Sequence, residues 1–143
     1  MTRRRFPPRL GGRRIASRFE PQAAAAFGRK RWRDLIGQAR LAVDLGRRGV
    51  LPTTLFQAQI RTALQRTGAA PLPVEAEQAS AAEQARTAFA AAVEDLLRAV
   101  TPEQRIERAA ALSAACDAVE HPLDLAAQAE ARRTWQRQFP GED

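Results

Sequence analysis

Residues 27–49 read FGRKRWRDLIGQARLAVDLGRRG, and they carry two patterns at helical spacing. Apolar residues recur every three or four positions, as they do on the face of a helix that packs against a core. The members of this face are Trp32, Leu35, Ile36, Ala39, Val43 and Gly46. The segment is therefore predicted to form an amphipathic helix with Trp32 in the core.

Four arginines form a second line beside this apolar face. They are Arg29, Arg33, Arg40 and Arg47, and we call them the arginine stripe. At 100° per residue they lie within about 40° of one another, along a line of roughly 27 Å. Three interpretations are open: the stripe contacts the phosphates of a nucleic acid, it pairs with acids on other helices or on another subunit, or it is a solvated face. The candidate acids for such pairs are Glu94, Asp95, Glu103 and Glu107.

The composition of the 143 residues indicates an all-α protein. Ala, Leu, Arg, Gln and Glu dominate, whereas Val, Ile and Thr are few and Tyr is absent. The length fits one domain that buries a hydrophobic core. We expect no membrane contact, because no apolar run approaches the length of a membrane span. The single cysteine, Cys116, fits a cytoplasmic location.

Thr, Pro and Gly divide the sequence into a bundle of about five helices over residues 22–139. The expected helices cover residues 22–48, 53–66, 75–100, 102–119 and 122–139. Gly49 is expected to end the first helix, and Thr53 or Thr54 to cap the second. Residues 101–104, Thr-Pro-Glu-Gln, fit a capping box, and Pro122 is expected to start the last helix. The Pro-containing linker 68–74 either crosses a single bundle or joins two sub-units, residues 22–67 and residues 75–139.

The first 21 residues are predicted to form an extended basic arm that becomes ordered on a partner. Seven arginines precede the first acid, Glu20, and Pro–Pro and Gly–Gly pairs interrupt any regular element. Residues 1–50 carry 14 basic and 3 acidic side chains, whereas residues 51–143 carry 9 basic and 13 acidic ones. This asymmetry is typical of a polyanion-binding segment on a scaffold. Residues 140–143 form a short acidic tail.

The candidate nucleic-acid contacts are basic side chains in both of these segments. They comprise the arginine stripe together with Lys30, Arg3, Arg4, Arg5, Arg13 and Arg14. Phe6 and Phe19 lie between the arginines, where they are candidates for stacking on bases or for docking on a protein.

The sequence carries no recognisable catalytic motif. HExxH, CxxC and GxxxxGK[ST] are absent, and only one His and one Cys are available. Cys116 and His121 are predicted to be a core cysteine and a helix-end histidine rather than a catalytic dyad. We therefore expect a protein that is not an enzyme and that holds no metal and no cofactor.

The size, the helical pattern and the basic face of residues 22–139 resemble the small helical subunit of multi-subunit CRISPR effector complexes of the Cascade type. This resemblance implies a ribonucleoprotein of antiviral defence, in which copies of the subunit stack along a filament. It also implies that the arginine stripe contacts the nucleic-acid backbone, and that the Ala-rich helices form surfaces between copies.

Our first functional expectation is a non-catalytic, nucleic-acid-binding subunit of a larger assembly. Its partners would be RNA or single-stranded DNA, other protein subunits and copies of itself, bound with weak sequence specificity. One alternative is a scaffold whose arginines dock on an acidic protein. Another is a small dimeric regulator that reads duplex DNA with the helix over residues 53–66. The readers on that helix would be Gln57, Gln59, Arg61 and Gln65.

Overall fold

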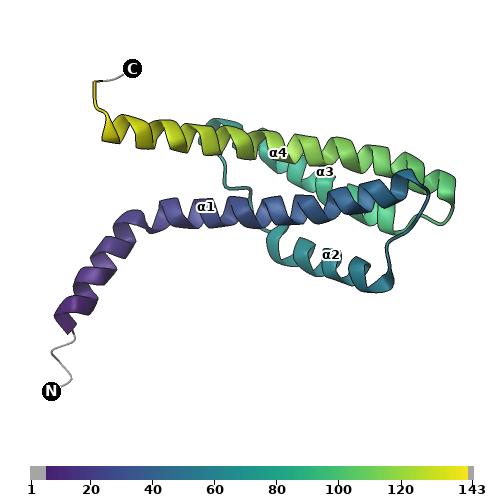
Figure 1. Ribbon diagram of the computed structural model, residues 1–143, viewed down its shortest axis with the longest axis horizontal. Coiled ribbons are helices and arrows are strands. Elements are labelled where there is room, and N and C mark those ends of the chain that lie inside the picture. Colours follow the sequence, from purple (N-terminus) through teal and green to yellow (C-terminus); the bar gives the residue numbers. More distant parts are fainter. Residues whose placement is uncertain (1–5, 142–143) are drawn as a thin grey trace.

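The computed structural model describes the backbone of residues 6–141 and the side chains of residues 23–141. Four helices follow one another: α1 (Phe6–Arg47), α2 (Thr54–Thr67), α3 (Ala79–Leu97) and α4 (Pro102–Gln138). A short 3₁₀ turn, η2 (Ala76–Gln78), precedes α3. All regular elements within residues 6–141 are helical, which confirms the predicted all-α class (Figure 1).

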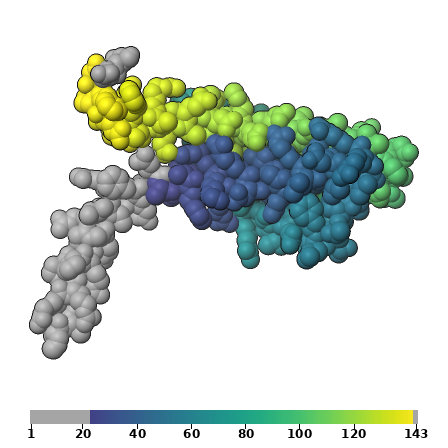
Figure 2. Space-filling model, in the orientation of Figure 1, coloured from purple at the N-terminus to yellow at the C-terminus, as the bar shows by residue number. Residues whose placement is uncertain are grey.

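The two long helices, α1 and α4, lie side by side and run in opposite directions (Figure 1). α3 packs on α4, and α2 packs chiefly on α1. Figure 2 shows the packed part of α1 between α4 on one side and α2 on the other. α1 therefore presents two different sides to two neighbouring helices.

The predicted apolar face of α1 is the centre of the core. Trp32, Leu35, Ile36, Ala39 and Val43 are all at most 3% exposed, which confirms the prediction. The same core contains residues of α2, α3 and α4, so residues on both sides of the linker 68–74 share it. It follows that core side chains from both stretches, residues 23–67 and residues 75–139, are packed together.

One aromatic contact joins α1 to α3 inside that core. The rings of Trp32 and Phe89 meet edge to face with centroids 5.8 Å apart. Aromatic pairs favour this arrangement because the positive edge of one ring faces the negative face of the other.

The predicted helix caps are present. The Thr101 hydroxyl accepts a hydrogen bond from the Gln104 N–H, and the Gln104 side chain accepts one from the Thr101 N–H. This is the capping box expected at the start of α4. At the start of α2, the Thr53 hydroxyl accepts from the Phe56 N–H.

The end of α1 is formed by a glycine, as the sequence predicts. Gly49 has a φ of 74°, a left-handed conformation that glycine adopts without strain. Its N–H donates to the Gly46 carbonyl at 2.9 Å. The Val50 N–H donates to the Leu45 carbonyl at 3.0 Å, which completes a Schellman motif.

Pro122 does not start a new helix, so this prediction is wrong. α4 continues through it, and the described residues contain four α-helices instead of about five. A proline inside a helix removes one backbone hydrogen bond and costs about 3 kcal/mol. Val119 and Leu123, on either side of Pro122, are fully buried. Their burial stabilises the helix across the proline.

The N-terminal arm is not confirmed as an extended segment. α1 begins at Phe6 rather than at residue 22, and proline is tolerated in the first turn of a helix, where Pro7 and Pro8 lie. Residues 1–5 and the side chains of residues 6–22 lie outside the described part of the chain, as do Glu142 and Asp143 of the predicted acidic tail. Among the helices of residues 6–141, none has the length and apolar character needed to cross a bilayer.

The approach of α1 to α4 requires a glycine at position 46. A Cβ atom added to Gly46 would lie 2.9 Å from the Ala109 Cβ and 3.2 Å from the Arg105 carbonyl oxygen. Gly37 is also on α1, but a Cβ added there meets no atom within 4 Å. The two glycines therefore form a matched pair for testing this contact.

We expect Gly46→Ala to lower the free energy of unfolding by about 1–2 kcal/mol, because overpacking against α4 outweighs the gain in helix propensity. Gly37→Ala should raise it by up to about 1 kcal/mol, because alanine is the better helix former. Urea unfolding of both variants measures these changes. A Gly46→Ala protein that is as stable as Gly37→Ala would contradict the close contact of the two helices.

Candidate nucleic-acid interface

The arginine stripe of α1 faces α4, and each of its four members binds an acceptor there. The contacts are Arg29 with Glu130, Arg33 with Asp124, Arg40 with Asp117 and Glu120, and Arg47 with the Ser113 hydroxyl. Because the two helices are antiparallel, successive arginines of α1 meet successively earlier residues of α4. The stripe thus lies along the length of the α1–α4 contact.

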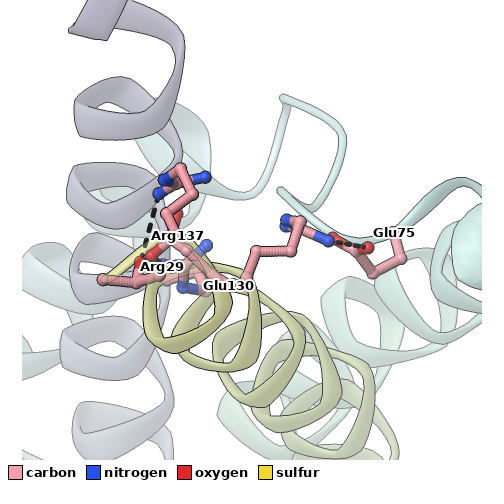
Figure 3. Close-up of polar contacts among 6 residues, drawn as sticks. Arg29, Glu75, Glu130 and Arg137 are labelled. Carbon is pink, nitrogen blue, oxygen red and sulfur yellow. Dashed lines mark hydrogen bonds and ion pairs between the residues drawn. The ribbon is translucent and has the colours of Figure 1, made fainter. Parts of the chain in front are cut away.

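Arg29 makes the most buried of these ion pairs. The Arg29 residue is 8% exposed, and its Nη2 lies 2.5 Å from the Glu130 Oε1 (Figure 3). The same part of α4 also contacts the segment before α3. Arg133, three residues after Glu130, donates to both carboxylate oxygens of Glu75. The hydrogen bonds from Arg133 lower the pKa of Glu75. The end of α4 is therefore linked to two other parts of the fold.

Arg40 is the central member of the stripe and binds two carboxylates. Its Nη2 lies 2.8 Å from the Asp117 Oδ1 and 2.6 Å from the Glu120 Oε1. The hydrogen bonds to Asp117 and then to Glu120 raise the pKa of Arg40 above its already high usual value. Arg33 makes a longer and more exposed contact, 3.3 Å from the Asp124 Oδ1. This geometry matches the second interpretation of the stripe, pairing within the bundle.

The acids that the sequence analysis names as partners of the stripe do not pair with it, so that prediction is wrong. Glu94 instead lies 3.3 Å from Arg61 and 3.9 Å from Arg98, and the Asp95 carbonyl accepts from Arg108. The partners of the stripe lie further along the chain, and a signal for them was present in the sequence. Asp117, Glu120 and Asp124 fall within about 60° of one another on a continuous helix. The expected helix break at Pro122 divided this row, so it was not recognised.

Of the remaining predicted nucleic-acid contacts, the structure describes the side chain of Lys30 alone. Lys30 is exposed and lies 3.4 Å from Asp34, one turn further along α1. Arg3, Arg4 and Arg5 lie outside the described residues, and so do the side chains of Arg13, Arg14, Phe6 and Phe19. Their role as nucleic-acid contacts stays a prediction.

Two of the four predicted duplex readers on α2 are engaged within the protein. The Gln57 Nε2 donates to the Pro52 carbonyl at 2.8 Å. Arg61 donates to Glu94 of α3. Gln59 and Gln65 are exposed. The geometry of α2 therefore favours packing over the reading of base edges.

Cys116 and His121 do not come together as a nucleophile and base. Cys116 is fully buried, and this burial raises the pKa of its thiol to about 11. His121 is exposed on the same continuous helix, and it lies about 140° from Cys116 around the helix axis. The thiol therefore stays protonated at neutral pH, which is unlike an activated nucleophile. Within the described residues, no three His, Cys, Asp or Glu side chains gather as a metal site requires.

The structure also shows an aromatic surface at the end of α4, where Trp135 and Phe139 are 52% and 42% exposed. Their rings stack with centroids 4.2 Å apart near the end of α4. A hollow of about 330 Å³ lies between Trp135 and Arg29. This aromatic pair is available to a partner.

Comparisons with known protein families, with curated proteins and with solved structures found no match to this chain. The similarity to small subunits of CRISPR effector complexes therefore stays a prediction from the sequence.

The Arg29–Glu130 pair gives a direct test of the structural role of the stripe. We expect Arg29→Met, which keeps the apolar stem, to lower the free energy of unfolding by at least about 2 kcal/mol, approaching the roughly 3–5 kcal/mol of a fully buried pair. The loss arises because Glu130 remains partly buried without a partner. Urea unfolding provides the measurement.

Two variants complete this test. Lys30→Met breaks an exposed pair on the same helix and should change stability by less than about 0.5 kcal/mol. Arg29→Met/Glu130→Gln should recover much of the loss, because the unpaired charge is removed. Equal effects of Arg29→Met and Lys30→Met would show that the buried pair does not stabilise the α1–α4 contact.

Proposed function

We propose that this protein is a non-catalytic, nucleic-acid-binding subunit of a larger assembly, and that its N-terminal arginines make the main phosphate contacts. The distribution of charge carries this proposal. Residues 1–22 contain seven arginines and one acid, a net charge of +6. Residues 23–141 contain 16 basic and 13 acidic side chains, a net charge of only +3. The positive excess is therefore concentrated ahead of the packed bundle.

The ion pairs of the stripe explain why the bundle itself is a weaker candidate. A phosphate that approached Arg40 would also approach Asp117 and Glu120, which repel it. If Arg40 turned away to bind the phosphate, these two carboxylates would lose their partner. The N-terminal segment has no comparable number of acids, so its arginines can release counterions from a nucleic acid at lower cost.

Single-stranded RNA or DNA is the class of nucleic acid that the proposal favours. Phe6 and Phe19 lie among the N-terminal arginines, and aromatic rings beside cations are typical of single-strand binders. Two readers of α2 are also committed to contacts inside the fold, which weighs against a duplex-reading regulator. We place the protein in the cytoplasm with other subunits, as the CRISPR resemblance would imply.

A second candidate function, docking on an acidic protein, is favoured by the surface at the end of α4. Exposed Trp135 and Phe139 lie on the same turns as exposed Arg132 and Arg137. Tryptophan and arginine are enriched among the residues that dominate protein–protein affinity. Such a partner would contact α4, whereas the leading proposal requires the N-terminal arginines.

The test compares two variants of the full chain. In the first, all seven arginines of residues 3–18 become glutamine; in the second, Arg33 and Arg40 become glutamine. We expect wild type to bind single-stranded RNA or DNA with a slope of log affinity on log salt of up to about −5, since each phosphate contact contributes about −0.7. The first variant should lose at least about a hundredfold in affinity at low salt, and the second should stay within about threefold.

Labelled single-stranded RNA, single-stranded DNA and duplex DNA are titrated across a salt series, with circular dichroism to verify folding. Loss of affinity in the Arg33/Arg40 variant alone would show that the stripe, and not the N-terminal segment, contacts the phosphates. If folded wild type binds none of the three at low salt, the proposal fails and the acidic protein partner becomes the better candidate.

A further inference from the structure

The side of α1 that faces α2 contains a groove that none of the preceding functions uses. It has a volume of about 430 Å³, within the range of small-molecule sites. A second hollow of about 240 Å³ adjoins it, because both are lined by Arg31, Arg66 and Thr67. At 100° per residue, Arg31 and Gln38 lie on the opposite side of α1 from the stripe. This groove is therefore separate from the α1–α4 ion pairs.

The two arginines at the junction of these hollows differ from those of the stripe. Arg31 and Arg66 are exposed, and neither forms an ion pair within residues 23–141. The Arg31 guanidinium lies over the Phe27 ring, 5.8 Å from its centroid. The one acid in the groove, Asp34, is paired with Lys30. Two arginines from different helices thus line the same hollows, with their charge available to an anion.

The rest of the groove offers groups that recognise a base or a sugar. Gln38, Gln59 and Thr62 contribute amides and a hydroxyl, and Leu35 contributes an apolar wall. The Gln38 Oε1 is buried, and it has no hydrogen-bond partner within the described part of the chain. A side-chain amide can donate and accept hydrogen bonds at once, which matches the edge of a nucleobase. Amide and hydroxyl groups therefore line the same groove as the two arginines.

We propose that the groove between α1 and α2 binds a nucleotide, with its phosphate on Arg31 and Arg66 and its base toward Gln38 and Gln59. Guanidinium groups suit this role because their planar donors match phosphate oxygens. A free nucleotide and one nucleotide of a single strand offer the same chemistry. The site does not depend on the N-terminal arginines, so it can succeed or fail independently of the main proposal.

The experiment follows the side-chain amide signals of Gln38 and Gln59 by NMR in the isotopically labelled full chain. The probes are the four ribonucleoside monophosphates, inorganic phosphate and a single-stranded hexanucleotide, each at low salt. We expect a nucleotide or the hexanucleotide to shift the signals of both amides. Inorganic phosphate should bind with an affinity at least tenfold lower. Binding by a monophosphate identifies a free nucleotide, and binding by the hexanucleotide alone identifies a unit of a strand.

Two variants with equal charge changes decide whether the arginines of the groove are specific. Arg31→Gln/Arg66→Gln should weaken the binding at least tenfold. Arg98→Gln/Arg132→Gln, which removes two exposed arginines outside the groove, should leave it within twofold. The proposal is overturned if no probe moves the Gln38 and Gln59 signals, if inorganic phosphate binds equally well, or if both variants lose binding to the same extent. Binding by the N-terminal arginines would leave these two amides unshifted.

Discussion

The contact between α1 and α4 is the interaction on which the rest of the structure depends. It combines an apolar layer with a row of ion pairs that runs from Arg29 to Arg40 along the antiparallel helices. The apolar layer supplies most of the stabilisation, because burial of apolar surface is the dominant favourable term in folding. The ion pairs at its edge restrict the register of the two helices, since a shift of one turn would leave carboxylates without partners. Gly46 allows the close approach that both sets of contacts require.

This contact also determines which charges can serve another molecule. Because the stripe is paired with α4, the arginines available to another molecule include those of the N-terminal segment, those beside the α1–α2 groove and those on the end of α4. The ligands that we propose for these three places differ: a polyanion, a nucleotide and a protein with exposed acids. A single helix, α1, links the first two, because it continues from the N-terminal segment into the wall of the groove.

Much of the fold follows from local patterns in the sequence. The apolar face around Trp32, the capping box at Thr101 and the glycine at the end of α1 are all found as predicted, because each depends on residues within a few positions of one another. The same local reasoning predicted a helix break at Pro122. This prediction is wrong, because burial of Val119 and Leu123 outweighs the lost hydrogen bond. That error concealed the acidic row on α4. The groove was not predictable, because its walls come from two helices whose relative rotation is set by the core.

The most direct test of the central claim observes the stripe itself while a nucleic acid is bound. The guanidinium signals of Arg33 and Arg40 can be assigned by NMR with single Arg→Lys variants, and followed as a single-stranded oligonucleotide is added to the wild-type chain. The account predicts that both sets of signals stay in place, because their carboxylate partners on α4 retain them, while arginine signals from residues 3–18 move. Movement of the Arg33 and Arg40 signals in parallel with saturation by the oligonucleotide would contradict it, and would show that the stripe leaves α4 to bind phosphate.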